Sequence, residues 1–306
     1  MVRLITGAGG MMGSHLYDAL RGKDVLPTFY NSTLDPRETI TQEMEMLDVL
    51  DFERVKMVLA EVRPDVIYHL AAQSRPDVSF HDPVLTIESN VIGTTNLLQA
   101  CAELGLKPLF INASSSAVYG ETMNEFNETP DDWIMPPNET DRCLPLSPYG
   151  TSKLAQEHIV KNFNQMHGIP YVNVRIFNCT GPRKINDFVS DVCRRVVNKE
   201  FPLKVGNLDG LRSIVDVRDL VRGLVLCENI KNETINLGSD VSHKIGDVLK
   251  LIAGDTPYEV ANYLLRPTDE PIILGNINKA KDLLGWKQEI TLEQTITDTL
   301  DYWRTL

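Results

Sequence analysis

The chain has 306 residues, 42% of them hydrophobic and 24% charged, a composition typical of a globular protein large enough for two lobes. The formal net charge of -12, with no compensating run of Lys and Arg, argues against partners such as nucleic acid or a membrane surface. No apolar stretch could span a membrane, Met1–Ala8 is too short for a signal peptide, and five scattered cysteines predict free thiols, no metal site and a cytoplasmic location.

The N-terminus has the pattern of a strand, a glycine-rich loop and a helix. The apolar run Val2–Thr6 predicts the strand, and Ser14–Leu20 predicts the helix. Between them, Gly7, Gly10 and Gly13 follow a G-x-x-G-x-x-G spacing. Such glycines permit a tight turn, a close approach of the backbone to a pyrophosphate, and close packing of the helix on the strand. The pattern therefore favours dinucleotide binding over an ordinary glycine-rich turn.

The end of the second predicted strand bears on the choice of cofactor. This strand, Val25–Phe29, is not followed by the acidic residue that would bind the ribose hydroxyls of NAD. No arginine stands there for the 2′-phosphate of NADP, since Arg37 lies further along a polar loop. We expect a modest preference for NADP(H), with NAD(H) as the alternative. A third strand, Met44–Leu47, places Asp48 where it could accept from the adenine amino group or simply face solvent.

Helices and apolar strands then alternate through residue 178. The predicted helices are Phe52–Val62 and Ile87–Leu104, and the predicted strands are Val66–Leu70, Pro108–Asn112 and Tyr171–Phe177. This alternation is typical of an α/β fold with a doubly wound parallel sheet of the Rossmann type. Ala71 and Ala72 follow the fourth strand, where small residues would let the backbone lie beside a nicotinamide ribose.

The fifth strand leads into the serine-rich segment Ser114–Ser116. Ligands of open α/β sheets bind beyond the carboxyl ends of the strands, so we expect these serines to face the cofactor. The long, acidic, proline-containing loop Glu121–Leu146 comes next, and we expect it to cover part of the substrate.

A helix start at Ser147 carries the most reactive pair of side chains. Tyr149 and Lys153 stand four residues apart, so they share one face of the helix that Pro148 opens. A Lys ammonium beside a phenol favours the phenolate, and we expect it to lower the Tyr149 pKa from its usual value of about 10. Tyr149 is thus a candidate acid/base for a sugar hydroxyl or carbonyl, whereas the pair alone would also suit an ordinary protein surface.

The remaining elements predict a smaller C-terminal lobe of mixed α/β structure. We expect strands at Leu203–Gly206 and Thr234–Leu237, and helices at Phe188–Asn198, Val217–Cys227, Ile245–Ile252, Ile277–Leu284 and Leu292–Trp303. The predicted dinucleotide-binding domain comprises residues 1–178 and the segment 212–241, and the predicted sugar-nucleotide lobe comprises 179–211 and 242–306.

Together, the glycine loop, Ser115 at a strand end and Tyr149-x-x-x-Lys153 resemble the extended short-chain dehydrogenases/reductases, which mostly act on nucleotide sugars. The resemblance covers essentially the whole chain and implies that Ser115, Tyr149 and Lys153 are catalytic. The cofactor contacts that it implies come from Gly7, Gly10, Met11, Met12, Gly13, Asn31, Asp48, Leu70, Ala71, Ala72, Asn90, Tyr149 and Lys153.

Two segments resemble the GDP-mannose branch of this family, which includes GDP-mannose 4,6-dehydratase and GDP-4-keto-6-deoxy-D-mannose reductase. They are Gly206–Arg212 and Arg266–Asp269, which look like diphosphate- and nucleoside-binding segments. Arginines suit this role because a guanidinium binds diphosphate oxygens bidentately. The substrate contacts implied are Ser74, Ser116, Asn178, Val189, Arg212, Arg266 and Asp269. A GDP-linked sugar is the expected partner, and a homodimer or homotetramer the expected assembly.

One departure from the branch bears on the reaction. The dehydratases place a Glu two residues after the catalytic Ser or Thr, where it drives loss of water; here that residue is Ala117. Glu121 and Glu128 in the following loop are poorer substitutes. We therefore expect reduction of a GDP-linked 4-keto-6-deoxy-hexose at C4, with 4-epimerisation as the alternative because residues 114–120 resemble those of 4-epimerases. The intact catalytic residues argue against a non-catalytic, NADP-sensing protein.

Overall fold

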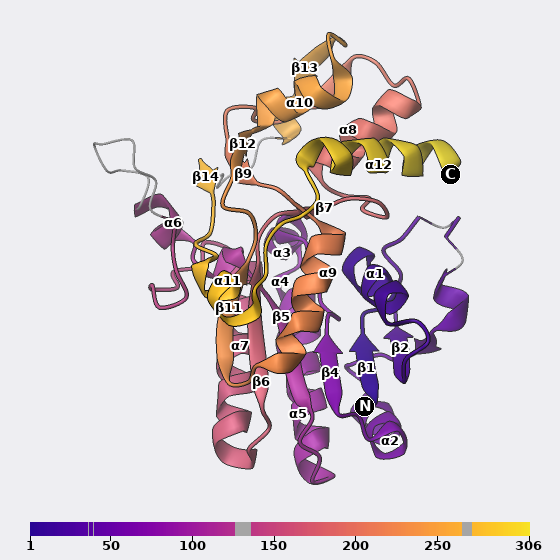
Figure 1. Cartoon of the computed structure of the whole chain (residues 1–306), viewed down its shortest axis with the longest axis vertical. Coiled ribbons are helices and arrows are strands. Elements are labelled where there is room, and N and C mark those ends of the chain that lie inside the picture. The colour runs from indigo at the N-terminus through magenta and orange to yellow at the C-terminus, as the bar shows by residue number, and fades with distance from the viewer. Residues whose placement is uncertain (36, 39, 126–135, 265–270) are drawn as a thin grey trace.

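The computed structural model describes residues 1–35, 37–38, 40–125, 136–264 and 271–306, and it contains a seven-stranded parallel sheet (Figure 1). In spatial order the strands are β11 (Glu233–Leu237), β6 (Tyr171–Ile176), β5 (Leu109–Ser115), β4 (Val66–His69), β1 (Arg3–Thr6), β2 (Val25–Phe29) and β3 (Glu45–Met46). The chain adds strands in one direction from β1 to β3 and in the other from β4 onward. The topological switch point therefore lies between β1 and β4, and the predicted doubly wound sheet is confirmed.

Helices cover both faces of the sheet because its strands are apolar on both sides. The twelve α-helices of the described residues are α1 (Met11–Leu20), α2 (Phe52–Val62), α3 (Pro76–His81), α4 (Pro83–Ile87), α5 (Gly93–Glu103), α6 (Glu121–Glu125), α7 (Pro148–His167), α8 (Phe188–Val197), α9 (Val217–Leu226), α10 (Ile245–Ala253), α11 (Asn278–Leu284) and α12 (Leu292–Thr305). Consecutive strand residues such as Leu4 and Ile5 belong to different hydrophobic clusters, one with α2, α5 and α7 and the other with α1 and α9.

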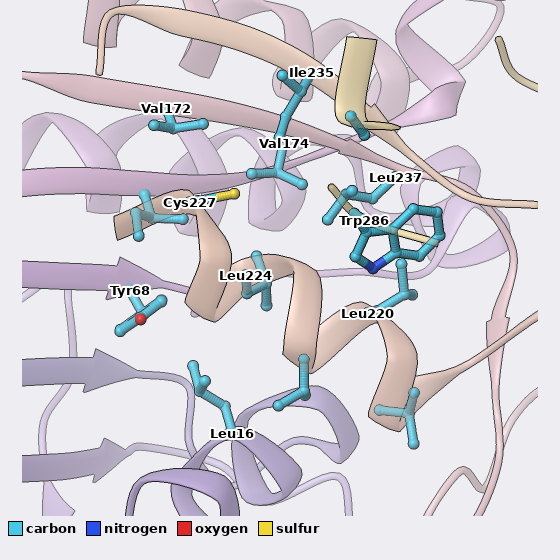
Figure 2. Close-up of a cluster of buried hydrophobic side chains, with 14 of the residues drawn as sticks. Leu16, Tyr68, Val172, Val174, Leu220, Leu224, Cys227, Ile235, Leu237 and Trp286 are labelled. Atoms are coloured by element: carbon cyan, nitrogen blue, oxygen red, sulfur yellow. The ribbon is translucent and has the colours of Figure 1, made fainter. Parts of the chain in front are cut away.

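Helix α9 forms the centre of one of these clusters. Figure 2 shows Leu220, Leu224 and Cys227 directed toward the strands, with Trp286 beside them. The Trp286 indole Nε1 donates to the Asp219 carbonyl at 3.0 Å, so the segment after α11 is fixed on α9. A Cβ added at Gly223 would lie 2.9 Å from that Nε1, which explains why a glycine occupies this helix position.

A smaller group of elements lies above the end of the sheet toward which the strands point (Figure 1). Its short strands are β7 (Cys179–Thr180), β8 (Leu203–Val205), β9 (Leu211–Ser213), β10 (Val215–Asp216), β12 (Ser242–Lys244), β13 (Tyr258–Val260) and β14 (Ile272–Ile273). Helices α8, α10 and α12 and strand β8 share a separate hydrophobic cluster that includes Val192, Leu203, Val248 and Trp303. The residue bounds that we expect for two lobes stay a prediction.

Several element boundaries differ from those expected from sequence. Helix α1 begins at Met11 rather than Ser14, and α3 was not expected at all. The helix expected at Ile87–Leu104 begins at Pro83, because the Asp82 side chain accepts from the Leu85 N–H and caps it, and residues Glu88–Ile92 form a π-helical turn within it. The short strands β7, β9, β10, β12, β13 and β14 were also missed, since two or three residues carry no detectable alternation.

The segment Glu121–Leu146, which was expected to be one long loop, contains regular structure at its start and near its end. Helix α6 occupies its start, and Leu144 near its end pairs with Gly120. Gly120 has φ +51, and a Cβ there would lie 1.9 Å from the Leu144 carbonyl oxygen, so only glycine permits this contact. Residues 126–135, including Glu128, lie outside the described residues, so the predicted cover over the substrate stays a prediction.

All five cysteine thiols are unpaired. Among the residues that the structure describes, none of the helices has the length and apolar character needed to cross a membrane.

The buried carboxylate of Asp219 provides a test of how the C-terminal segment is held. Its side chain is 0% exposed and accepts from the backbone N–H groups of Glu289 and Ile290 at 3.0 and 2.9 Å, as well as from Arg222. We expect Asp219→Ala to lower the free energy of unfolding by about 1–3 kcal/mol, because donors lose their buried acceptor. Urea denaturation measures this change.

The matched control is Glu289→Ala, which removes a second, largely exposed partner of the same Arg222. Exposed ion pairs contribute at most about 1 kcal/mol, so this variant should unfold near the wild-type midpoint. Equal effects of the two substitutions would contradict the role given to Asp219.

Candidate active site

Helix α7 places Tyr149 and Lys153 against the carboxyl end of β5. The Ser147 hydroxyl caps the helix by accepting from the Gly150 N–H at 3.0 Å, and Pro148 occupies its first turn. The helix start lies so close to the residues after β5 that a Cβ at Gly150 would be 2.5 Å from the Ala117 carbonyl oxygen. Tyr149 and Lys153 are consequently buried, at 8% and 4% exposure.

Ser115, Tyr149 and Lys153 come together at this point. Ser115 is the last residue of β5, and its half-buried hydroxyl accepts from the Ala117 N–H at 3.2 Å and lies close enough to the Tyr149 phenol to influence its pKa. The Lys153 Nζ donates to the Ala113 carbonyl at 2.8 Å and lies 5.9 Å from the centre of the Tyr149 ring. Proximity of the three side chains is thus established, and their catalytic roles remain to be proposed.

The electrostatics of the pair differ from the sequence-based expectation. Burial raises the pKa of Tyr149, with the hydrogen bond from Ser115 opposing it, and burial lowers the pKa of Lys153 to about 7. The expectation that Lys153 would lower the Tyr149 pKa was wrong for this structure, because removal from water disfavours both charged forms. At neutral pH Tyr149 is therefore a neutral phenol, the form that can donate a proton.

The glycine loop after β1 forms a cradle at the topological switch point. Gly7 has φ +75, and a Cβ there would lie 2.5 Å from the Ala71 N atom. A Cβ at Gly13 would lie 2.3 Å from the Gly7 carbonyl oxygen. A Cβ at Gly10, in contrast, would meet no protein atom closer than 3.4 Å. Gly7 and Gly13 are therefore required by the packing of the fold, whereas Gly10 leaves an open approach to the backbone.

The N-terminus of α1 fits an anionic ligand at this opening. No side chain caps the helix, whose first residues are Met11 and Met12, and no acidic residue occupies its first turn. The free N–H groups and the helix dipole of such an N-terminus favour a phosphate group. Together with the open face of Gly10, this geometry fits the pyrophosphate of a dinucleotide.

The segment after β2 offers hydroxyl and amide groups but no free arginine. Asn31, Ser32 and Thr33 are exposed, and Ser32 donates to the Gly9 carbonyl at 3.0 Å, which ties this segment to the glycine loop. Arg37 forms an ion pair with Asp35 at 2.7 Å.

Asp48 lies at the rim of the same region. It lines a hollow of about 370 Å³ together with Tyr30, Met46, Asp51 and Arg54. Its carboxylate accepts from the Leu50 N–H at 2.9 Å, so it has a structural role beside any contact with adenine.

Asn90 organises the other side of the predicted cofactor site. Its side chain accepts from the Gln73 N–H at 2.8 Å and donates to the Gln73 carbonyl at 3.0 Å and to Ser152 at 2.8 Å. It thereby joins α7 to the segment after β4, where Leu70, Ala71 and Ala72 are half-buried. Asn90 is buried, so it positions these neighbours whether or not it touches the cofactor itself.

A buried polar network beneath this region was not anticipated. His69 is 1% exposed, with Nδ1 2.8 Å from the Thr6 hydroxyl and Nε2 2.9 Å from the Thr94 hydroxyl. Gln156 donates to the same Thr94 at 2.5 Å. Burial, with the nearby Lys153 charge, lowers the pKa of His69 to about 3. Its one signal in the sequence is a histidine within an otherwise apolar strand.

The predicted substrate residues are spread over the rim above the catalytic pair. Ser74 is exposed, Ser116 is half-buried, and the Nδ2 atom of Asn178 is buried without a protein partner among the described residues. An unsatisfied buried amide is costly, so it suits a ligand that accepts a hydrogen bond.

The residues predicted to bind the nucleotide lie in different surroundings or outside the described residues. Val189 is 3% exposed, and its side chain belongs to a hydrophobic cluster. Arg212 lies on β9 and donates to the Leu211 carbonyl at 3.0 Å and the Pro271 carbonyl at 3.2 Å, among other interactions. Arg266 and Asp269 lie outside the described residues.

Comparison with known proteins identifies the family. The family model described as GDP-mannose 4,6 dehydratase matches residues 4–299. GDP-mannose 4,6-dehydratase of Vibrio cholerae is 30% identical over 97% of this chain and 92% of its own length. UDP-glucose 4-epimerase of Thermus thermophilus in complex with NAD has a TM-score of 0.86 and 30% identity, covering 99% of both chains. The RMD protein of Pseudomonas aeruginosa, complexed with NADPH, has a TM-score of 0.82 and 26% identity, covering 100% of this chain and 99% of its own.

Two glycines of the loop, Gly10 and Gly13, give separable predictions. Gly10→Ala should fold with nearly wild-type stability, because its Cβ meets no atom within 3.4 Å, yet raise the Kd for NADPH about tenfold or more by occupying the pyrophosphate approach. Fluorescence titration with NADPH and thermal unfolding measure the two effects.

Gly13→Ala serves as the comparison, since its Cβ would overlap the Gly7 carbonyl and should lower the unfolding midpoint. Wild-type NADPH affinity in Gly10→Ala would remove the basis for placing the pyrophosphate here.

Proposed function

The chain belongs to the GDP-mannose 4,6-dehydratase family of extended short-chain dehydrogenases/reductases, and from this premise we propose that it is an NADP(H)-dependent reductase of a GDP-linked 4-keto-6-deoxy-hexose. Its relatives include nucleotide-sugar dehydratases, reductases and epimerases. The proposal selects reduction at C4 from these three activities.

The observation that carries this choice is the residue at position 117, two residues after Ser115. Ala117 occupies the position where the dehydratases of this branch are expected to have a Glu, and its methyl group cannot take up or deliver a proton. Among the described residues, only burial and Ser115 influence the pKa of Tyr149, and no acid does. Elimination of water from the sugar ring needs such a group, whereas hydride transfer at C4 does not.

The catalytic pair suits the donation of a proton. A bound nicotinamide dinucleotide supplies the hydride. Ser115 and Tyr149 hydrogen-bond the C4 oxygen of the sugar and stabilise the negative charge that develops there. Tyr149, which burial keeps as a neutral phenol, then gives its proton to that oxygen. Lys153, which donates to the Ala113 carbonyl and lies 5.9 Å from the centre of the Tyr149 ring, would bind the nicotinamide ribose.

Substrate position depends on contacts remote from C4. Asn178, with an unsatisfied buried amide nitrogen, would donate to the sugar or the diphosphate, and Ser74 and Ser116 line the same rim. Arg212, with Arg266 and Asp269 from the resembling segment, would bind the diphosphate and nucleoside. Binding energy from these groups positions C4 against the nicotinamide. The preference for guanine rests on the family branch.

NADP(H) is the proposed cofactor, because β2 is not followed by an acidic residue that would repel a 2′-phosphate. Asn31 and Thr33 have exposed side chains that can donate to it at that point. Assembly as a homodimer or homotetramer is part of the same proposal, carried over from the sequence.

Epimerisation at C4 is the second candidate. The serine-rich segment 114–120 resembles that of 4-epimerases, and the same three catalytic side chains would serve. An epimerase must first oxidise a sugar hydroxyl, for which Tyr149 must be a phenolate, and burial opposes that form. An epimerase also retains its cofactor, whereas a reductase exchanges it after each turnover.

A substitution at Tyr149 tests its proposed role as the proton donor. Tyr149→Phe should lower kcat by roughly 10²–10⁴, because the proton donor is lost, and leave the Kd for NADPH within a few-fold. Steady-state assays and NADPH titration test this. Tyr171→Phe is the control and should retain full activity, because Tyr171 is the first residue of β6 and lies at the amino end of that strand. Substantial activity in Tyr149→Phe would show that another group donates the proton.

The reaction itself is tested by adding GDP-4-keto-6-deoxymannose and NADPH to the purified protein. We expect one NADPH oxidised for each GDP-6-deoxyhexose formed, followed by absorbance at the nicotinamide band and by chromatography of the sugar nucleotide. A parallel titration with NADH measures the cofactor preference. A separate incubation with GDP-mannose tests the two other activities. Interconversion with its C4 epimer without net change in the cofactor would assign the epimerase activity instead, and loss of water would assign the dehydratase activity.

A further inference from the structure

Three side chains of α7 contact consecutive residues at the end of β5. Tyr149, Lys153 and Glu157 are spaced four residues apart and share one helix face. The Tyr149 phenol lies close enough to Ser115 for its pKa to be lowered by that hydroxyl, Lys153 donates to the Ala113 carbonyl, and Glu157 accepts from the Ser114 hydroxyl at 2.6 Å. The third contact lies next to the catalytic serine but has no role in the reaction described so far.

Glu157 joins three elements through one buried carboxylate. Its Oε1 accepts from Ser114 of β5 and from Arg175 Nε of β6 at 2.9 Å, and its Oε2 accepts from Arg175 Nη2 at 2.8 Å. The Arg175 and Glu157 side chains are 4% and 1% exposed. Ser114 and Arg175 are direct partners in the sheet register, so the carboxylate bridges neighbouring strands to the helix.

Arg175 extends this link to the segment that leads into Tyr149. Its Nη1 donates to the Tyr119 hydroxyl at 3.0 Å and to the Glu139 carbonyl at 3.3 Å, and its guanidinium lies 4.9 Å from the centre of the Tyr119 ring. The Tyr119 hydroxyl donates to Asn236 Oδ1 at 2.7 Å, and the Asn236 N–H donates to Glu139 at 2.7 Å. One network thus holds Tyr119 and Glu139, two points of the segment between β5 and α7.

A buried ion pair is a weak source of net stability, because desolvation offsets most of the attraction between its charges. It is, however, a strong geometric constraint when every donor and acceptor is used in a bidentate arrangement. We propose that Glu157 is a positioning residue that, through Ser114 and Arg175, fixes the end of β5 so that Ser115 meets Tyr149 at the reacting oxygen. This rests on the proposed C4 chemistry for the identity of that oxygen.

The chain contains a matched control of the same composition. Arg3 donates to Glu228 through Nε at 2.6 Å and Nη2 at 2.9 Å, and the Tyr68 hydroxyl donates to the same carboxylate at 2.6 Å. Arg3 begins β1, so this Arg–Glu–Tyr group lies away from the carboxyl ends of the strands. Substitutions here report the general effect of losing such a contact.

The experiment compares Ser114→Ala and Tyr119→Phe with Tyr68→Phe and Glu228→Gln. The first two remove single hydroxyls and leave the Glu157–Arg175 pair intact, so they avoid an unpaired buried charge. We expect them to lower kcat by roughly ten- to a hundredfold, with KM and the Kd for NADPH nearly unchanged, because small misplacements of reacting groups have effects of that size. The two control variants should alter stability alone.

A second readout needs no substrate. In protein labelled with [ζ-¹³C]tyrosine, with the Tyr149 signal assigned by its loss in Tyr149→Phe, the Tyr149 pKa can be followed by NMR. Ser114→Ala should raise this pKa, because Ser115 is released from the phenol, whereas Tyr68→Phe should leave it unchanged.

The two readouts separate the possible failures. A wild-type protein without C4 reductase activity would overturn the proposed function but leave the pKa comparison decisive for Glu157. An unchanged Tyr149 pKa in Ser114→Ala, or a fall in kcat no larger than in the controls, would overturn the positioning role.

Discussion

The register of α7 on β5 is the constraint on which the rest of the site depends. Gly150 allows the helix start to approach the Ala117 carbonyl, and Ser147 caps the helix at the point where Tyr149 must be buried. With that register set, Tyr149 reaches Ser115 and Lys153 reaches the Ala113 carbonyl. The glycine cradle at the switch point between β1 and β4 faces the same end of the sheet, so the predicted cofactor and the catalytic pair share one edge.

Burial of Tyr149 favours the donation of a proton over its removal from the substrate. Burial raises the pKa of Tyr149, so its proton stays on the phenol, and burial lowers the pKa of Lys153 to about 7. A carboxylate beside Tyr149 could remove a proton from the sugar ring. Among the described residues, no carboxylate influences the pKa of Tyr149. The nearest acid along α7, Glu157, is occupied by Ser114 and Arg175. The same fold in its relatives serves dehydration, reduction and epimerisation, so differences of this kind decide the reaction.

Much of the fold was predictable because its signals are local. Long apolar strands such as Val25–Phe29 and helices such as Phe52–Val62 were located to the residue, and the glycine spacing and Tyr149-x-x-x-Lys153 identified the family. Short strands such as β7 were missed, since their pairing depends on distant segments. The Tyr149 pKa was predicted in the wrong direction, because a neighbouring charge is visible in a sequence and the extent of burial is not. The Glu157–Arg175 pair was missed because its two residues lie on separate elements, α7 and β6.

The central claim is that C4 receives a hydride from the cofactor and its oxygen receives a proton from Tyr149, and that no proton is removed from the ring. It is tested most directly with NADPH deuterated at the transferable position of its nicotinamide, in light water, and with unlabelled NADPH in D₂O. Mass spectrometry and NMR of the sugar product should find cofactor deuterium at C4 and, relative to an enzyme-free control, no solvent deuterium at C3 or C5. Solvent deuterium at C3 or C5, or a cofactor that keeps its label while the sugar changes, would contradict this claim.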